Sequence, residues 1–88
     1  MGKVAAQLKV MPTGTEVDLD ALEADLADAL PEGAELTDVE REDVAFGLVA
    51  LITMVVVPDE AGGTEAVESA FAEVASVESV SVDSVTRL

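Results

Sequence analysis

Hydrophobic and polar positions alternate along the start of the chain, from Lys3 to Met11. One face of this segment carries Val4, Ala6, Leu8 and Val10, and the other carries Lys3, Ala5, Gln7 and Lys9. A period of two residues is typical of a strand with one buried face. The segment is therefore predicted to be a strand that ends at Pro12, because proline cannot donate a hydrogen bond to a sheet.

Two later segments repeat their apolar residues at helical spacing. The first begins after Asp18, an expected N-cap, and its apolar positions are Leu19, Leu22, Leu26 and Leu30. The second begins after Thr64, also an expected N-cap, and its apolar positions are Val67, Ala70, Phe71 and Val74. Steps of three and four residues place each set on one side of a helix. We therefore predict two amphipathic helices, the first closed by Pro31-Glu32-Gly33.

Two neighbouring strands are predicted between these helices. The segment from Leu36 to Val44 is mostly charged, which is typical of an exposed strand at the edge of a sheet. The run from Val44 to Val57 has Thr53 as its one polar side chain and is rich in β-branched residues, which favours a central strand. A tight connection at Ala45-Phe46-Gly47 joins the two. The central strand is apolar on both of its faces.

The last segment, from Val77 to Leu88, is predicted to be a strand with a bulge, because its alternation shifts phase at Val85. The complete order is strand, helix, strand, strand, helix, strand. This order predicts an α+β fold of the ferredoxin-like, split β-α-β class. Right-handed crossovers give a four-stranded antiparallel sheet of order 4-1-3-2 with both helices on one face. Residues 1–88 are expected to form one domain.

Composition and charge exclude several classes of function. Nineteen acidic and four basic residues give a net charge of −15, which repels nucleic acids and anionic membranes and resembles proteins that work in concentrated salt. There is no Cys and no His, so the usual metal ligands, disulfides and neutral-pH nucleophiles are missing. We expect neither an enzyme nor a cofactor. The start of the chain lacks an apolar signal segment, which favours a cytoplasmic protein.

Two weak motifs favour ordinary structural roles. Asp18, Asp20 and Glu23 are acidic, but a calcium loop needs glycine where Glu23 stands, so a solvated helix face is preferred and no metal site is predicted. Gly62-Gly63-Thr64 precedes a helix and could hold an anion on backbone N–H groups. Acidic residues surround that segment, so a simple helix cap is preferred there.

The open face of the sheet is the first candidate binding surface. Helices on one face leave half of the central strand exposed, either Leu48, Ala50, Ile52, Met54 and Val56 or Val49, Leu51, Val55 and Val57. An uncovered apolar face serves docking to another protein or self-association, and we favour docking, with a monomer when free. By the alternation, Lys3 and Lys9 point to this face. Arg87 is expected to join them from the adjacent last strand, and the alternative is that the bulge in that strand reverses it.

Four segments resemble one known family over essentially the whole chain. They are Gly2-Lys3-Val4 with Leu8-Lys9-Val10-Met11-Pro12, the stretch Leu30-Pro31-Glu32-Gly33, the connection Ala45-Phe46-Gly47-Leu48, and the end Val82-Asp83-Ser84-Val85-Thr86-Arg87-Leu88. In this order they are similar to the archaeal translation elongation factor 1-beta family. The resemblance implies a ferredoxin-like guanine nucleotide exchange factor. It would release GDP from elongation factor 1-alpha, the GTPase that brings aminoacyl-tRNA to the ribosome.

The resemblance also implies roles for individual residues. In eukaryotic relatives a lysine next to the C-terminal residue approaches the magnesium region of the GTPase, and Arg87 stands at that position. The aromatic ring of the family's Phe-Gly turn contacts the GTPase, and here that turn is Phe46-Gly47. A core phenylalanine at a hairpin is an equal alternative for Phe46. With Lys3 and Lys9 from the open face of the sheet, the predicted partner-binding residues are Arg87, Phe46, Gly47, Lys3 and Lys9. The alternative is a small-molecule-sensing regulatory domain of the same fold.

Overall fold

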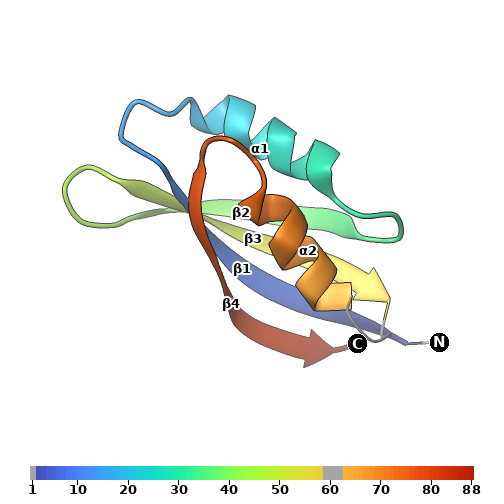
Figure 1. The fold of residues 1–88 in the computed structure, drawn as a ribbon. Helices are drawn as coiled ribbons and strands as arrows, with labels where there is room; N and C mark the ends of the chain where they lie inside the picture. The colour runs from blue at the N-terminus through green and yellow to red at the C-terminus, as the bar shows by residue number, and fades with distance from the viewer. Residues whose placement is uncertain (1, 59–62) are drawn as a thin grey trace.

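The computed structural model describes residues 2–58 and 63–88. Its elements are β1 (Lys3–Pro12), α1 (Leu19–Ala29), β2 (Glu35–Asp43), β3 (Val49–Pro58), α2 (Gly63–Ala72) and β4 (Val77–Arg87). The strands form one antiparallel sheet of order β2-β3-β1-β4, and both helices cover the same face of it (Figure 1). The predicted ferredoxin-like fold and the 4-1-3-2 strand order are therefore confirmed.

A single core lies between the sheet and the two helices. β1 contributes its predicted inner face, and the helices contribute two residues each from their stripes. The buried hydrophobic core consists of Val4, Ala6, Leu8, Val10, Leu22, Leu26, Leu51, Val55, Val57, Val67 and Phe71. Only one aromatic ring is among them, so the core depends on the packing of aliphatic side chains around Phe71.

β3 settles which half of the apolar run faces the helices. Leu51, Val55 and Val57 point into the core. Ile52, Met54 and Val56 lie half-buried on the open face, where Ala50 is fully buried. Of the two sets that the sequence left open, the one with Ala50, Ile52, Met54 and Val56 is therefore the one on the open face. Thr53 also points inward, and its hydroxyl donates to the Leu8 carbonyl oxygen across 3.0 Å, so no buried polar atom is left unsatisfied there.

Most element boundaries lie within one or two residues of the predicted ones, but the starts of β3 and α2 need correction. β3 begins at Val49 instead of Val44, because the residues before it form the hairpin turn. α2 begins at Gly63, so Thr64 lies inside its first turn and is not the N-cap. The predicted N-cap of α1 is correct, because the Asp18 carboxylate accepts from Asp20 N and Ala21 N at 3.1 and 3.3 Å. The predicted cap segment at Gly62 lies outside the described residues.

The long axis of the molecule follows the strands. The molecule measures 42 Å along that axis and about half as much across it. The β2–β3 hairpin lies at one end of this axis, and both chain termini lie at the other end (Figure 1). In the described ranges, no helix is long and apolar enough to cross a membrane. The fold therefore has two distinct ends that present different residues.

Candidate partner-binding site

The β2–β3 connection is a tight turn with unusual backbone geometry. Phe46 has φ of 61° and Gly47 has φ of 79°. The turn is closed by Leu48 N–H, which donates to the Ala45 carbonyl oxygen at 3.2 Å, and by Val44 N–H, which donates to the Leu48 carbonyl oxygen at 2.8 Å. Positive φ at both central residues is the pattern of a type I′ turn, where Asn or Gly is usual at the first of them. Phe46 is the one non-glycine residue with positive φ among those described.

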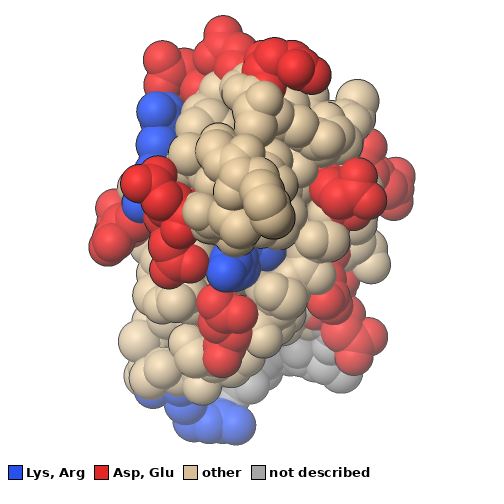
Figure 2. Space-filling view, turned by 90° about the vertical axis from the view of Figure 1, so that its left-hand side faces the viewer, with Lys and Arg blue, Asp and Glu red and all other residues tan. Residues whose placement is uncertain are grey.

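Phe46 is also the most exposed large apolar side chain of the described residues. The residue is 95% exposed, and Val44 on the same hairpin is 39% exposed. Figure 2 looks directly at this end and shows an uncharged projection with acidic side chains around it and a basic side chain directly beneath it. A bulky residue in the left-handed region is strained by roughly 1 to 2 kcal/mol. The turn thus keeps an aromatic ring in water and in a strained conformation, and neither feature favours the free protein.

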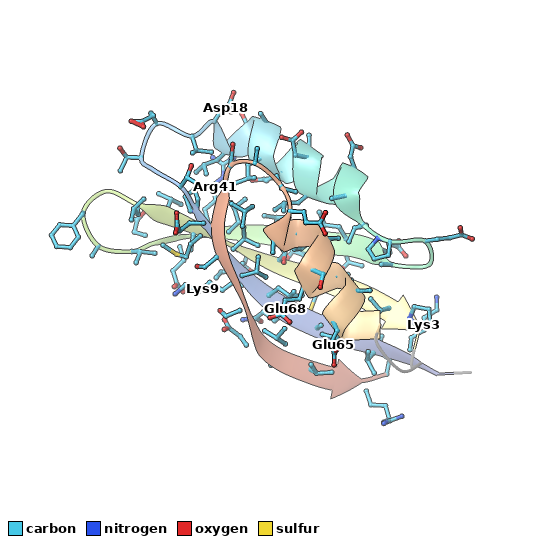
Figure 3. The ribbon with its side chains drawn as sticks, in the orientation of Figure 1. Lys3, Lys9, Asp18, Arg41, Glu65 and Glu68 are labelled. Atoms are coloured by element: carbon cyan, nitrogen blue, oxygen red, sulfur yellow. The ribbon has the colours of Figure 1, made fainter. Side chains whose placement is uncertain are left out.

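Lys9 lies on β1, opposite Ile52 of the hairpin strand β3. Its side chain lies on the open face, as predicted, and its Nζ is 3.2 Å from Glu42 Oε1 on β2. Lys9 therefore forms an ion pair within the protein that the sequence did not reveal. It lies toward the hairpin end of β1, and Lys3 lies toward the opposite end (Figure 3).

The other end of the molecule carries Lys3, Arg87 and the C-terminus. Leu88 N–H donates to the Lys3 carbonyl oxygen at 2.8 Å, so the backbone stays attached to β1 up to the last residue. Arg87 is exposed on β4, and Leu88 is 69% exposed. The predicted cation at the C-terminus is therefore presented on ordered backbone.

The expectation that Arg87 shares the open face with the two lysines is wrong. Arg87 pairs with Val4, whose side chain points to the helices, and opposite residues in antiparallel strands share a face. The reason is a register shift after Val82, where Asp83 is the extra residue of β4. An extra residue reverses every later side chain of a strand. Of the three, only Lys3 and Lys9 share the open face.

The predicted site residues form two groups. Phe46, Gly47 and Lys9 belong to the hairpin end, and Lys3 and Arg87 belong to the end with the termini. From Val4 to Val10 alone, β1 rises about 20 Å at about 3.4 Å per residue. A partner that touches both groups must therefore contact the molecule along most of its length.

Sequence reasoning missed two residues of β2 that lie just before the hairpin turn, Arg41 and Glu42. Arg41 Nη2 lies 2.6 Å from Asp20 Oδ1 and 3.0 Å from Glu23 Oε2, and its Nε donates to the same Glu23 oxygen at 3.1 Å. These hydrogen bonds, first the one to Asp20 and then that to Glu23, raise the pKa of Arg41 above its ordinary value. A signal was present, because alternation from Val39 puts Arg41 on the helix side. Its acidic partners on α1 required the tertiary structure.

Comparison with known proteins identifies the family. Residues 5–88 match the EF-1 guanine nucleotide exchange domain. The chain belongs to this family. Its relatives include the elongation factor 1-beta of Halobacterium salinarum, with 62% identity, and that of Natronomonas pharaonis, with 61% identity; each similarity spans the whole of both chains. The elongation factor 1-beta of Methanothermobacter thermautotrophicus is 48% identical over all of this chain and 99% of its own.

Family membership decides between the two functions left open by the sequence. The domain is a guanine nucleotide exchange factor for elongation factor 1-alpha in translation elongation. Nucleotide exchange forms and breaks no covalent bond, so it needs contact residues and not a catalytic centre. Within residues 2–58 and 63–88, no group of three or more acidic side chains is arranged to hold a metal ion.

Proposed function

We propose that the two ends of this domain do different work during exchange. The hairpin end, with Phe46-Gly47 and Lys9, anchors the GTPase, and the end with Arg87 and Lys3 weakens its hold on GDP. Residues 1–88 act as one domain, a monomer when free, in the cytoplasm and without a cofactor or enzymatic activity. The single observation that carries the proposal is Phe46, 95% exposed at φ of 61°.

The physical case for Phe46 as an anchor is energetic. An exposed aromatic ring gains roughly 25 cal/mol for each Å² of apolar surface that a partner buries. Binding hot spots are typically aromatic or Arg side chains that enter a pocket of the partner. The two hydrogen bonds that close the turn limit the motion of the backbone below the ring, so less entropy is lost when the ring is buried. Phe46 therefore combines a large gain on binding with a small ordering cost.

The case for Arg87 is electrostatic. A guanidinium is always charged, and near a bound nucleotide it would compete with Mg²⁺ for phosphate and carboxylate oxygens. Weaker nucleotide binding in the complex implies weaker binding of the factor to the nucleotide-bound GTPase, by the same factor. That reciprocity lets GTP release the exchange factor at the end of the cycle. Lys3, on the neighbouring strand, adds positive potential at this end.

The proposal is tested by the release of a fluorescent GDP analogue from purified elongation factor 1-alpha. The wild-type chain should accelerate release, and Phe46→Ala should need at least tenfold more protein for half of the maximal effect. Val44→Ala is the matched control, because Val44 is an exposed apolar residue of the same hairpin outside its central turn positions. If Phe46→Ala titrates like the wild type, Phe46 is not the anchor.

A further inference from the structure

Two of the four basic residues, Arg41 and Lys9, form ion pairs at one point of β2, directly before the hairpin turn. Arg41 and Glu42 are consecutive, so their side chains project to opposite faces of the sheet. On the helix face, Arg41 binds Asp20 and Glu23 of α1. On the open face, Glu42 binds Lys9 of β1. β2 is therefore held from both sides at this point, and Figure 3 shows Arg41 and Lys9 near the same end of the sheet.

The ion pair on the open face crosses a whole strand. Glu42 is opposite Ala50 and Lys9 is opposite Ile52, so the pair runs diagonally over β3 between its two neighbours. Ala50 lies on this open face and is nevertheless 0% exposed. A small residue at this position leaves room for the two side chains above it. The pair thus connects the edge strand directly to the centre of the sheet.

These ion pairs contribute little to the global stability of the fold. The paired side chains are 31% to 90% exposed, and ion pairs at such sites contribute little to folding. The local effect is different, because β2 is an edge strand that, among the described strands, pairs with β3 alone. An edge hairpin with few neighbours is prone to local opening. The ion pairs of Arg41 and Glu42 lie just before the turn, so they can fix the position of the turn that carries Phe46.

We propose that Arg41 and Glu42 are positioning residues that hold the hairpin in the orientation in which Phe46 meets its partner. The inference rests on the proposed anchoring role of Phe46. Loss of either attachment lets the hairpin move, so fewer molecules present the ring correctly. The apparent affinity for the GTPase then falls, whereas the maximal rate of GDP release, which depends on the distant Arg87 end, is unchanged.

Hydrogen exchange of the full chain measures the hairpin directly. The reporters are the Val44 and Leu48 amides, which close the turn. Arg41→Met and Glu42→Gln should each speed their exchange by about 1.5- to 5-fold, the range that corresponds to the loss of an exposed pair. The β1–β4 amides should not change. Glu40→Gln is the matched control, because Glu40 lies on the same strand and face as Glu42 and has no ion pair with any described residue.

Titration of GDP release with the same variants supplies the functional measurement. Arg41→Met and Glu42→Gln should raise the half-saturating concentration and leave the maximal rate unchanged, unlike Glu40→Gln. Arg41→Glu should raise the half-saturating concentration further. The double variant Arg41→Glu with Glu23→Arg should lower it again in part, because it restores the ion pair with the charges reversed. If both variants match Glu40→Gln, or if only one of the two measurements changes, the positioning role is wrong.

Failure of the anchor and failure of the attachments can be told apart. If Phe46→Ala stimulates GDP release like the wild type, the proposed role of the hairpin fails, whatever the results for the Arg41 variants. If Phe46→Ala is defective but Arg41→Met and Glu42→Gln are normal in both measurements, the anchor stands and the positioning role is overturned. All variants are compared at one fixed salt concentration, because screening changes exposed ion pairs.

Discussion

Arg87 lies opposite Val4 on the neighbouring strand, so its side chain starts on the face of the sheet that carries the helices. Lys3, one residue earlier on β1, points to the open face. The two cations therefore flank the edge of the sheet at the end with the termini. A cation at a sheet end can reach a partner that approaches along the strands, beyond either face. This geometry fits insertion of Arg87 into a partner better than docking on the flat open face.

The strain at Phe46 predicts an opposite effect of one substitution on stability and on function. Phe46→Asn should raise the free energy of unfolding by about 0.5 to 1 kcal/mol, because Asn accepts positive φ and the exposed ring packs against little in the free protein. The same variant should be defective in GDP release. Denaturant melts and the release assay measure the two properties.

Gly47→Ala is the companion to that test. An added Cβ would have room, with Thr15 Cγ2 as its nearest neighbour at 3.6 Å, but φ of 79° disfavours any residue with a Cβ. We expect a loss of about 1 kcal/mol for placing alanine in the left-handed region. Equal stability of Gly47→Ala and the wild type would mean that the turn relaxes easily, and the argument from strain at Phe46 would fail with it.

Phe71→Ala should destabilise the fold by about 3 to 5 kcal/mol. Phe71 is 0% exposed in the middle of the core, and truncation leaves a cavity that aliphatic neighbours fill only in part. Phe46→Ala, at the exposed ring, should change stability by less than about 1 kcal/mol in the same denaturant melts. A change below about 1 kcal/mol for Phe71→Ala would show that the core is not organised around this ring.

The fold should depend on salt concentration. Nineteen acidic residues against four basic ones repel one another, and that repulsion is screened over about 3 Å at 1 M salt but over about 10 Å at 0.1 M. Dialysis from multimolar salt to about 0.05 M should lower the melting temperature and reduce the circular dichroism signal. A melting temperature that stays constant over this range would contradict adaptation to concentrated salt.

The sequence was sufficient for the fold because its periodicities are strong and local. Leu22 and Leu26 of α1 and Val67 and Phe71 of α2 are buried as the helical spacing predicts. The inner face of β1 follows in the same way from alternation. Each of these predictions uses neighbours within a few residues along the chain, and tertiary packing did not override them.

Features that depend on register could not be predicted in the same way. The side of Arg87 depends on the extra residue Asp83. The phase shift at Val85 indicated a bulge, but the pairing of β4 with β1 decides whether a bulge forms there and reverses the later side chains. The pair between Lys9 and Glu42 depends on the alignment of three strands. The exposure of Phe46 was also open from the sequence, because a phenylalanine before a strand can equally well be a core residue. Long-range alignment was the missing information for Arg87 and for the Lys9–Glu42 pair, whereas Phe46 needed the local geometry of its turn.

The most direct test of the two-ended account is a stopped-flow titration of GDP release from elongation factor 1-alpha with the wild type, Phe46→Ala and Arg87→Ala. Phe46→Ala should raise the half-saturating concentration and approach the wild-type maximal rate. Arg87→Ala should lower the maximal rate by about tenfold, which equals about 1.4 kcal/mol, with little change in half-saturation. Arg87→Lys should stay active, because an ammonium group is also a cation.

Free Mg²⁺ identifies the step on which Arg87 acts. If Arg87 competes with the metal, removal of Mg²⁺ should bring Arg87→Ala close to the wild-type rate, and excess Mg²⁺ should widen the difference between them. The melting temperature of Arg87→Ala should equal that of the wild type. A wild-type maximal rate for Arg87→Ala in excess Mg²⁺ would contradict the account and leave exchange to the hairpin and the open face.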